Sequence, residues 1–79
     1  MTREEVTKRT QVIFRDIFDN ASIVLYDDMT ANDLGGWDSL NHINLLSAIQ
    51  QEFQIKFELI ELQQLNNVGA IIDLIIRKK

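Results

Sequence analysis

The chain has 79 residues, which suits a single domain, and a domain of this size buries only about 60% of the surface that its unfolded chain exposes. We therefore expect one domain, residues 1–79, with a thin core and no deep, enclosed active site. The chain contains no cysteine, which excludes disulfides and thiolate metal sites, and its formal net charge of −4 disfavours binding to nucleic-acid phosphates.

The charge is unevenly distributed along the chain. Residues 16–61 contain nine acidic side chains against one base, Lys56, whereas the other basic residues lie near the two ends. An acidic centre favours partners with basic docking surfaces. The first ten residues lack the apolar stretch of a signal peptide, and no segment approaches the roughly 18 apolar residues of a membrane span. We expect a cytoplasmic protein that does not insert into membranes.

A first helix is predicted to begin after Thr2. Thr2 and Glu5 have the spacing of a capping box, in which each side chain accepts a hydrogen bond from a backbone N–H of the first turn. Asp19 and Asn20 are expected to end this helix. Between these limits, apolar residues recur at helical spacing: Val6, Ile13, Phe14, Ile17 and Phe18.

Residues 19–38 are predicted to form a long connection. Its apolar segment 23–26 is expected to pack against the core as an anchor, and the polar segment 27–33 follows. Connections longer than about 15 residues are uncommon in compact domains and are often functional. The acidic residues here do not predict a calcium site, because Asp33 occupies the glycine position of an EF-hand loop and Ser39 the position of its bidentate carboxylate.

Three further helices are predicted, which makes the fold an all-α four-helix bundle with three main helices, one short helix and a long first loop. The second helix runs from Ser39 to Phe53, a short third helix lies within residues 59–65, and Asn66 or Asn67 caps the last helix. The apolar face of the second helix consists of Leu40, Ile43, Leu46, Ile49 and Phe53, widened by Leu45 and Ala48. The last helix has the clearest amphipathic pattern, despite the strand propensity of isoleucine: Val68, Ile71, Ile72, Ile75 and Ile76.

Residues 34–40, Leu-Gly-Gly-Trp-Asp-Ser-Leu, carry the strongest functional signal. The glycines let the chain turn sharply before a helix whose first N–H groups are unpaired and whose dipole is positive at this end. A phosphate attached to Ser39 would lie where backbone donors and the dipole both favour an anion. An Asp-Ser-Leu tripeptide by itself is in most proteins only a helix cap, so this interpretation needs wider context.

That context is a family resemblance. Asp38-Ser39-Leu40 resembles the Asp-Ser-Leu signature of acyl carrier proteins, whose serine carries 4′-phosphopantetheine. The similarity covers nearly the whole chain and is firmest over residues 33–76. Within them, residues 45–53 resemble the core of that family's second helix, Asn66-Asn67 the polar residues before its last helix, and residues 68–75 that helix itself.

The resemblance implies a carrier that is not an enzyme. Ser39 would receive a covalent 4′-phosphopantetheine arm from coenzyme A through a phosphopantetheinyl transferase. The thiol of the arm would hold acyl groups as thioesters for acyl-loading and acyl-transfer enzymes. The expected recognition residues are Asp38, Leu40 and Ile43, the expected state is a monomer, and the apolar helix faces would shelter the acyl chain.

The chain departs from carriers of dedicated fatty-acid synthesis, which usually have a strongly acidic second helix. Asn44, Gln50 and Gln51 occupy positions that are often acidic there. The run 37–43, Trp-Asp-Ser-Leu-Asn-His-Ile, instead resembles discrete carriers of specialised pathways, such as polyketide-type or surface-polysaccharide-linked acyl chemistry. Residues 34–36, Leu-Gly-Gly, are similar to those before the serine of peptidyl carrier domains. Two alternatives therefore stay open: an aminoacyl or peptidyl carrier, and an interaction domain that keeps the fold without the arm.

Two neighbours of Ser39 are candidates for other roles. His42 lies three residues after Ser39, but Asp38 cannot easily reach back to orient it and no oxyanion hole is visible, so a catalytic pair is not predicted. We interpret His42 as a surface residue able to contact a partner or the arm. Trp37 is expected either to pack on the second helix or to contact a partner.

Overall fold

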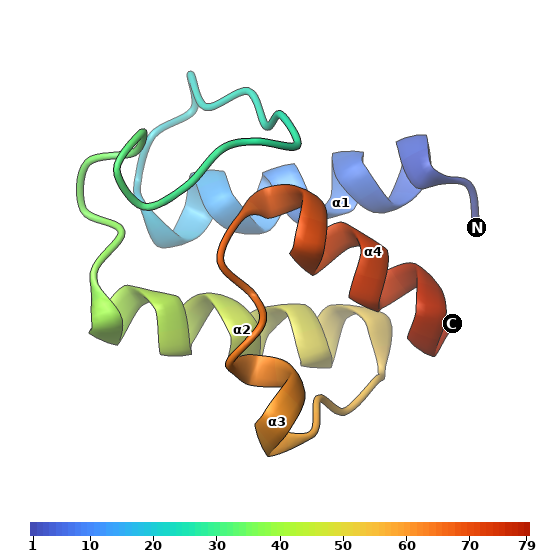
Figure 1. The fold of residues 1–79 in the computed structure, drawn as a ribbon. Coiled ribbons are helices and arrows are strands. Elements are labelled where there is room, and N and C mark those ends of the chain that lie inside the picture. Colours follow the sequence, from blue (N-terminus) through green and yellow to red (C-terminus); the bar gives the residue numbers. More distant parts are fainter.

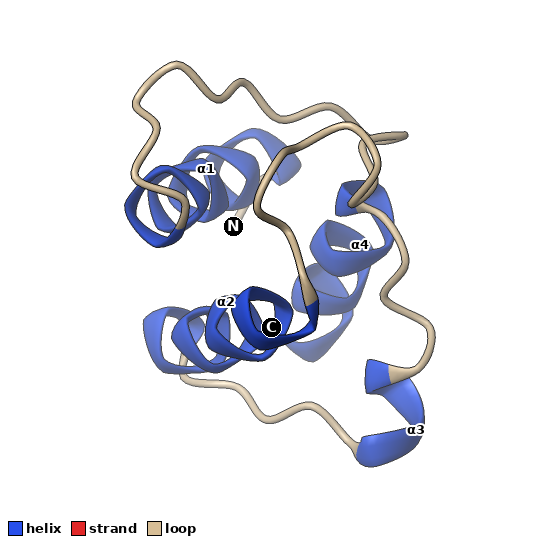
Figure 2. Cartoon of the chain, turned by 90° about the vertical axis from the view of Figure 1, so that its left-hand side faces the viewer, coloured by secondary structure: helices blue, strands red, loops and turns tan.

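The structure is a computed structural model that describes residues 1–79, and it consists of helices and loops (Figure 1). Its four helices are α1 (Arg3–Ile17), α2 (Ser39–Phe53), α3 (Leu59–Leu62) and α4 (Val68–Lys78). The predicted all-α fold with three main helices, one short helix and a long first loop is confirmed. Helix α1 packs on α2 and α4, and both ribbon views place α3 on the side away from α1 (Figures 1 and 2).

The main helices begin at side-chain caps, as the sequence indicated. In α1, Thr2 and Glu5 form the predicted capping box. In α4, Asn67 Oδ1 accepts a hydrogen bond from Ala70 N at 2.7 Å, so Asn67 is the cap of the two asparagines available. These oxygens satisfy N–H groups that the first turn of a helix leaves without an internal partner.

Helix α3 is shorter than the predicted segment 59–65, because it ends at Leu62. Beyond it the backbone forms tighter turns, in which Gln64 N donates to Glu61 O at 3.0 Å and Leu65 N donates to Leu62 O at 3.5 Å. This change of path turns Leu65 into the core, where only 4% of it is exposed. If α3 continued as an α-helix to residue 65, the backbone would take a different path.

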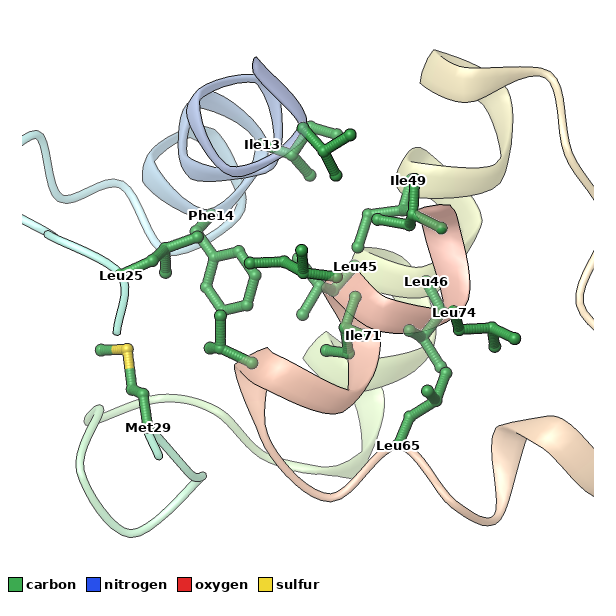
Figure 3. Close-up of a cluster of buried hydrophobic side chains, with 14 of the residues drawn as sticks. Ile13, Phe14, Leu25, Met29, Leu45, Leu46, Ile49, Leu65, Ile71 and Leu74 are labelled. Carbon is green, nitrogen blue, oxygen red and sulfur yellow. The ribbon is translucent and has the colours of Figure 1, made fainter. Parts of the chain in front are cut away.

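Nineteen buried apolar residues form one core. Figure 3 shows Phe14 of α1, Leu45 of α2 and Ile71 of α4 near its centre. The apolar stripe predicted for α4 is confirmed except at Ile76, which is partly exposed while Leu74 is buried in its place. The buried apolar residues of α4 are Val68, Ile71, Ile72, Leu74 and Ile75.

The apolar face of α2 is only partly buried. Leu40 and Ile43 remain 68% and 65% exposed, so the predicted apolar face continues past the core at the start of the helix, where these two residues are the expected recognition residues. No other part of the chain covers this side of the first turn. The residues of α2 that do enter the core are Leu45, Leu46, Ile49 and Phe53.

The long loop between α1 and α2 is anchored through buried side chains spread along it: Ile23, Leu25, Met29, Leu34 and Trp37. The predicted anchor, residues 23–26, is therefore confirmed at alternate positions only. Val24 and Tyr26 point away from the core and are exposed. Extended backbone directs successive side chains to opposite sides, which explains the alternation.

Backbone hydrogen bonds join this loop to the start of α4. Val68 N donates to Met29 O at 2.9 Å, and Gly69 N donates to Asp27 O at 2.9 Å. The loop carbonyls thus satisfy two further N–H groups of the first turn of α4. Arg3 of α1 forms an ion pair with Asp27 at 3.1 Å, which ties the same point of the loop to α1.

Two more ion pairs link the ends of the helices. The Arg9 guanidinium lies 2.7 Å from the Glu52 carboxylate and 4.5 Å from the centre of the Phe53 ring, which joins α1 to the end of α2. Lys78 Nζ lies 2.8 Å from Glu61 Oε1. This hydrogen bond from Lys78 is the main reason that the pKa of Glu61 is lowered, and it holds α3 against the end of α4.

The close approach of loop and helix predicts that a side chain at position 69 would crowd Asp27. A Cβ there would lie 3.0 Å from Asp27 O and 3.2 Å from Asp27 Cβ. Gly69→Ala should therefore lower the free energy of unfolding by about 1–2 kcal/mol, in spite of the better helix propensity of alanine. Urea unfolding followed by far-UV circular dichroism measures this change.

Gly35→Ala is the matched control, because a Cβ at Gly35 meets no atom within 4 Å. It should be neutral or stabilising by up to about 1 kcal/mol. Equal stabilities of Gly69→Ala and the unmodified chain would contradict the close contact between the loop and α4.

Candidate functional site

Ser39 is the first residue of α2, and the preceding residue, Asp38, caps this helix. Asp38 Oδ1 accepts a hydrogen bond from Asn41 N at 2.8 Å, so the acidic residue rather than the serine serves as the cap. The Ser39 side chain is exposed and makes no hydrogen bond within the chain. The N–H groups of Ser39 and Leu40 have no backbone partner either. The junction thus presents a free hydroxyl beside free donors at a helix N-terminus, where an anion is favoured.

A tight turn before Asp38 sets the direction in which the helix starts. Gly36 has a φ of 88°, a conformation that residues with a side chain rarely adopt. Its carbonyl oxygen accepts two hydrogen bonds, one from Asp38 N at 2.9 Å and one from the Asn41 side-chain amide at 2.8 Å. Gly36 is therefore the glycine that makes the predicted sharp turn before the helix.

Trp37 anchors the junction to the body of the protein. Its ring is 8% exposed and meets the Phe14 ring edge-on, with ring centres 5.3 Å apart. The Phe18 ring lies next to it at 6.3 Å. Of the two predicted roles for Trp37, packing within the fold is the one that the structure bears out, and the contact extends to α1 as well as α2.

His42 is not the plain surface residue that the sequence suggested. Its Nδ1 accepts a hydrogen bond from Trp37 Nε1 at 2.9 Å, and the two rings are stacked. Its side chain is half-buried, and this burial lowers the pKa of His42 from the usual 6.5. The hydrogen bond acts in the same direction, because an Nδ1 that bears a proton cannot accept. His42 is therefore a neutral imidazole at physiological pH.

A hollow of about 330 Å³ lies beside Ser39. Its wall comes from three parts of the chain that are far apart in sequence: the long loop, the first turn of α2, and the segment between α3 and α4. The lining residues are Ala31, Trp37, Asp38, Ser39, His42, Leu65 and Asn66. A second hollow of about 410 Å³ lies between α3 and α4, and Leu65 lines both. A chain attached to Ser39 would find space and mostly uncharged walls next to its point of attachment.

The sequence and the fold have known counterparts. Residues 9–75 match the family model described as the phosphopantetheine attachment site. Over 79 residues the chain is 34% identical to an acyl carrier protein of Cyanidium caldarium, and the match covers 99% of this chain and 91% of that protein. The chain belongs to the acyl carrier protein family.

A solved structure supports this membership. The solution NMR structure of the holo acyl carrier protein from Geobacter metallireducens is similar to this chain with a TM-score of 0.87 and 45% sequence identity. The match covers 92% of this chain and 84% of that one. The prosthetic group of this carrier is therefore covalently bound phosphopantetheine, and the exposed hydroxyl and adjoining hollow fit such a group.

The carrier also presents exposed apolar side chains near Ser39. Leu40 and Ile43 lie on α2, and Leu59 and Ile60 on α3 are 76% and 67% exposed. Sequence reasoning named the first two as recognition residues but missed the pair on α3. The sequence carries no signal for this pair, because a helix of four residues is too short for a periodic pattern to separate a buried face from an exposed one.

The structure has neither a cluster of metal-ligating side chains nor a helix suited to span a membrane. No group of three or more His, Cys, Asp or Glu side chains is placed to hold a metal ion. The carboxylate of Asp33 accepts from Thr30 N at 3.0 Å instead, within the loop. None of the helices combines the length and the apolar character that a membrane crossing requires.

The low pKa of His42 predicts an acid-sensitive contribution to stability. The unfolded chain binds a proton at this imidazole near the usual pKa of 6.5, whereas the folded carrier does so only at lower pH. Stability is thus lost as the pH falls from the unfolded pKa toward the lowered folded one. His42→Gln should remove this loss, because glutamine does not titrate and its oxygen can still accept from Trp37.

The measurement is the free energy of urea unfolding of both proteins from neutral pH to about pH 5, above the range in which most carboxylates titrate. The unmodified carrier should lose more stability over this range. An identical pH dependence of the two proteins would mean that the Trp37–His42 contact does not oppose protonation.

Proposed function

We propose that Ser39 is the residue to which phosphopantetheine is attached, and that residues 1–79 act as one carrier domain in the cytoplasm. The observation that carries this proposal is the junction at the start of α2. Because Asp38 takes over the capping role, the Ser39 hydroxyl stays free and exposed beside a hollow. A serine that capped its own helix would have its oxygen engaged with the backbone.

The attachment is a group transfer from coenzyme A. The Ser39 oxygen attacks the phosphorus next to the pantetheine, the new oxygen–phosphorus bond forms as the pyrophosphate bond breaks, adenosine bisphosphate leaves, and a base of the phosphopantetheinyl transferase takes the hydroxyl proton. The first-turn N–H groups of Ser39 and Leu40 favour the resulting anion. Once attached, the group supplies a terminal thiol that holds acyl chains as thioesters.

The carrier itself does no chemistry on its cargo in this proposal. His42, the one candidate base near Ser39, has its Nδ1 engaged with Trp37, and no acidic side chain accepts from it. What the chain contributes is presentation of the thioester to acyl-loading and acyl-transfer enzymes, together with shelter in the adjoining hollow. Leu65 would contact a sheltered chain from either hollow, because it lines both.

Partner enzymes are proposed to dock mainly through apolar contacts. Leu40 and Ile43 are largely exposed on α2, whereas Asp38 is occupied as a helix cap and acts by orienting the junction. The outward side of α2 continues through uncharged residues: Asn44, Ser47 and Gln51. The single acidic residue of this helix, Glu52, is paired with Arg9.

This surface favours the partners of a specialised acyl pathway over those of dedicated fatty-acid synthesis. Partners with basic side chains aimed at α2 would find no unpaired acidic residue on this helix, because the acidic residues of the central region lie mainly in the loop between α1 and α2. We propose polyketide-type or polysaccharide-linked acyl chemistry as the pathway class. The alternative of an interaction domain that keeps the fold without the arm is disfavoured, because such a domain would need neither the free Ser39 hydroxyl nor the hollow beside it.

Attachment at Ser39 predicts a defined change in intact mass. Incubation with coenzyme A and a broad-specificity phosphopantetheinyl transferase should add one phosphopantetheine to the carrier and none to Ser39→Ala. Ser47→Ala, which removes another exposed hydroxyl of the same helix, should be modified like the unmodified chain. Failure to gain mass in a folded, helical protein would contradict the proposal, and the mass of the species loaded in cells distinguishes acyl from aminoacyl cargo.

Apolar docking predicts a response to substitution but little response to salt. Ile43→Ser and Leu40→Ser should each lower kcat/KM of the transferase reaction about five- to thirtyfold, because each removes an apolar contact worth about 1–2 kcal/mol. Raising the ionic strength should change kcat/KM less than these substitutions do. Val12→Ser, an exposed apolar residue on α1, is the matched control. A strong salt dependence with no effect of either substitution would indicate charge-based docking instead.

A further inference from the structure

His42 lines the hollow beside Ser39 with only one of its two ring nitrogens engaged. Nδ1 accepts the hydrogen bond from Trp37 Nε1 at 2.9 Å, with the ring centres 5.9 Å apart. A neutral imidazole that accepts at Nδ1 carries its proton on Nε2. The indole of Trp37 therefore selects the tautomer in which Nε2 is a hydrogen-bond donor.

The Nε2–H group of His42 is free to bind something outside the protein. It has no partner within the chain, and no buried side-chain nitrogen or oxygen in the structure lacks a partner, so this nitrogen is open to solvent. His42 and Ser39 are three residues apart, which places them on the same side of α2, and both line the hollow. A donor thus lies within one helical turn of the proposed attachment point.

The chemistry of the hollow restricts what this donor can bind. Asp38 is its one charged lining residue, and neither lysine nor arginine reaches it. The other lining side chain with an N–H donor besides Trp37 and His42 is the Asn66 amide. A phosphopantetheine arm brings acceptor oxygens to such a wall, first at its phosphodiester and then at its amide carbonyls.

We propose that His42 Nε2–H donates a hydrogen bond to an acceptor oxygen of the phosphopantetheine arm and so holds the arm along the hollow. The inference rests on the proposed attachment at Ser39 and deepens it, because it names a residue that binds the arm. His42 is the binding residue, and Trp37 is a positioning residue that acts by fixing the tautomer.

A single hydrogen bond from the neutral imidazole is strong enough to bias the arm but not to trap it. Its loss changes the ratio of docked to free arm by about fivefold if the acceptor is an amide carbonyl, and by about tenfold or more if it is the charged phosphodiester. Partner enzymes can therefore withdraw the arm without unfolding the junction, and Asp38 and Gly36 keep their hydrogen bonds throughout.

NMR of the holo carrier tests this proposal directly, because the chain contains one histidine and one tryptophan, and the arm adds the sole phosphorus atom. Intact mass first establishes that the arm is attached. Absence of attachment would count against Ser39 as the site, whereas an attached arm without contact to His42 would overturn the present inference alone.

In the holo carrier we expect nuclear Overhauser contacts between the His42 ring and the arm, and a proton–nitrogen correlation that shows the proton on Nε2. If the phosphodiester is the acceptor, the phosphorus signal should change with pH as His42 titrates. If an amide carbonyl is the acceptor, the amide signals of the arm should change instead. The proposal would be overturned if neither the phosphorus signal nor the amide signals of the arm differed from those of free phosphopantetheine.

Substitutions of His42 and Trp37 distinguish the contribution of the Nε2–H donor from that of the aromatic ring. His42→Phe keeps a ring against Trp37 but has no N–H, and should lower the docked-to-free ratio by about fivefold or more. His42→Gln keeps an acceptor for Trp37 and a donor for the arm, and should retain most of the contacts even if His42→Phe proves unstable. Trp37→Phe should leave a mixture of His42 tautomers and an intermediate loss. Ser47→Ala serves as the unaffected control. Unchanged arm contacts in a folded His42→Phe carrier would overturn the proposal.

Discussion

The fold depends on the contact between the long first loop and the first turn of α4. A loop of this length has many carbonyl and N–H groups that need partners, and α4 begins with N–H groups that have none of their own. Both needs are met by two hydrogen bonds, in which Met29 O accepts from Val68 N and Asp27 O accepts from Gly69 N. The preference for glycine at position 69 follows from this pairing, since a Cβ there would lie 3.0 Å from Asp27 O.

That contact also makes the hollow beside Ser39 possible. Once the loop is held at Asp27 and Met29, the next residues must pass over the gap between α2 and the segment that leads into α4, and Ala31 becomes part of the wall. Leu65 closes the opposite side because α3 ends early and its connection turns inward. The hollow thus lies where the anchored loop and the segment after α3 meet the first turn of α2.

Features that depend on neighbouring residues could be predicted from the sequence, and features that depend on distant ones could not. The cap at Thr2 and the Asp-Ser-Leu junction involve residues within one helical turn, so their spacing is visible in the chain. The contact between Trp37 and His42 is also short in sequence, but it requires the chain direction that Gly36 sets, and nothing local fixes which way an indole turns. The hollow joins three separate segments and has no sequence pattern at all.

The exposure of Leu40 and Ile43 is instructive because it concerns the proposed docking surface. A helical repeat of apolar residues predicts a buried stripe on the assumption that a neighbour covers its whole length. Here the neighbours cover α2 from Leu45 onward, and the stripe runs past them onto the surface. Exposed apolar side chains cost the folded chain little when they lie singly, and these two lie within one turn of Ser39, where the proposed partners would dock. In the proposed carrier, the beginning of α2 is the place where the bundle leaves apolar side chains uncovered next to the proposed attachment point.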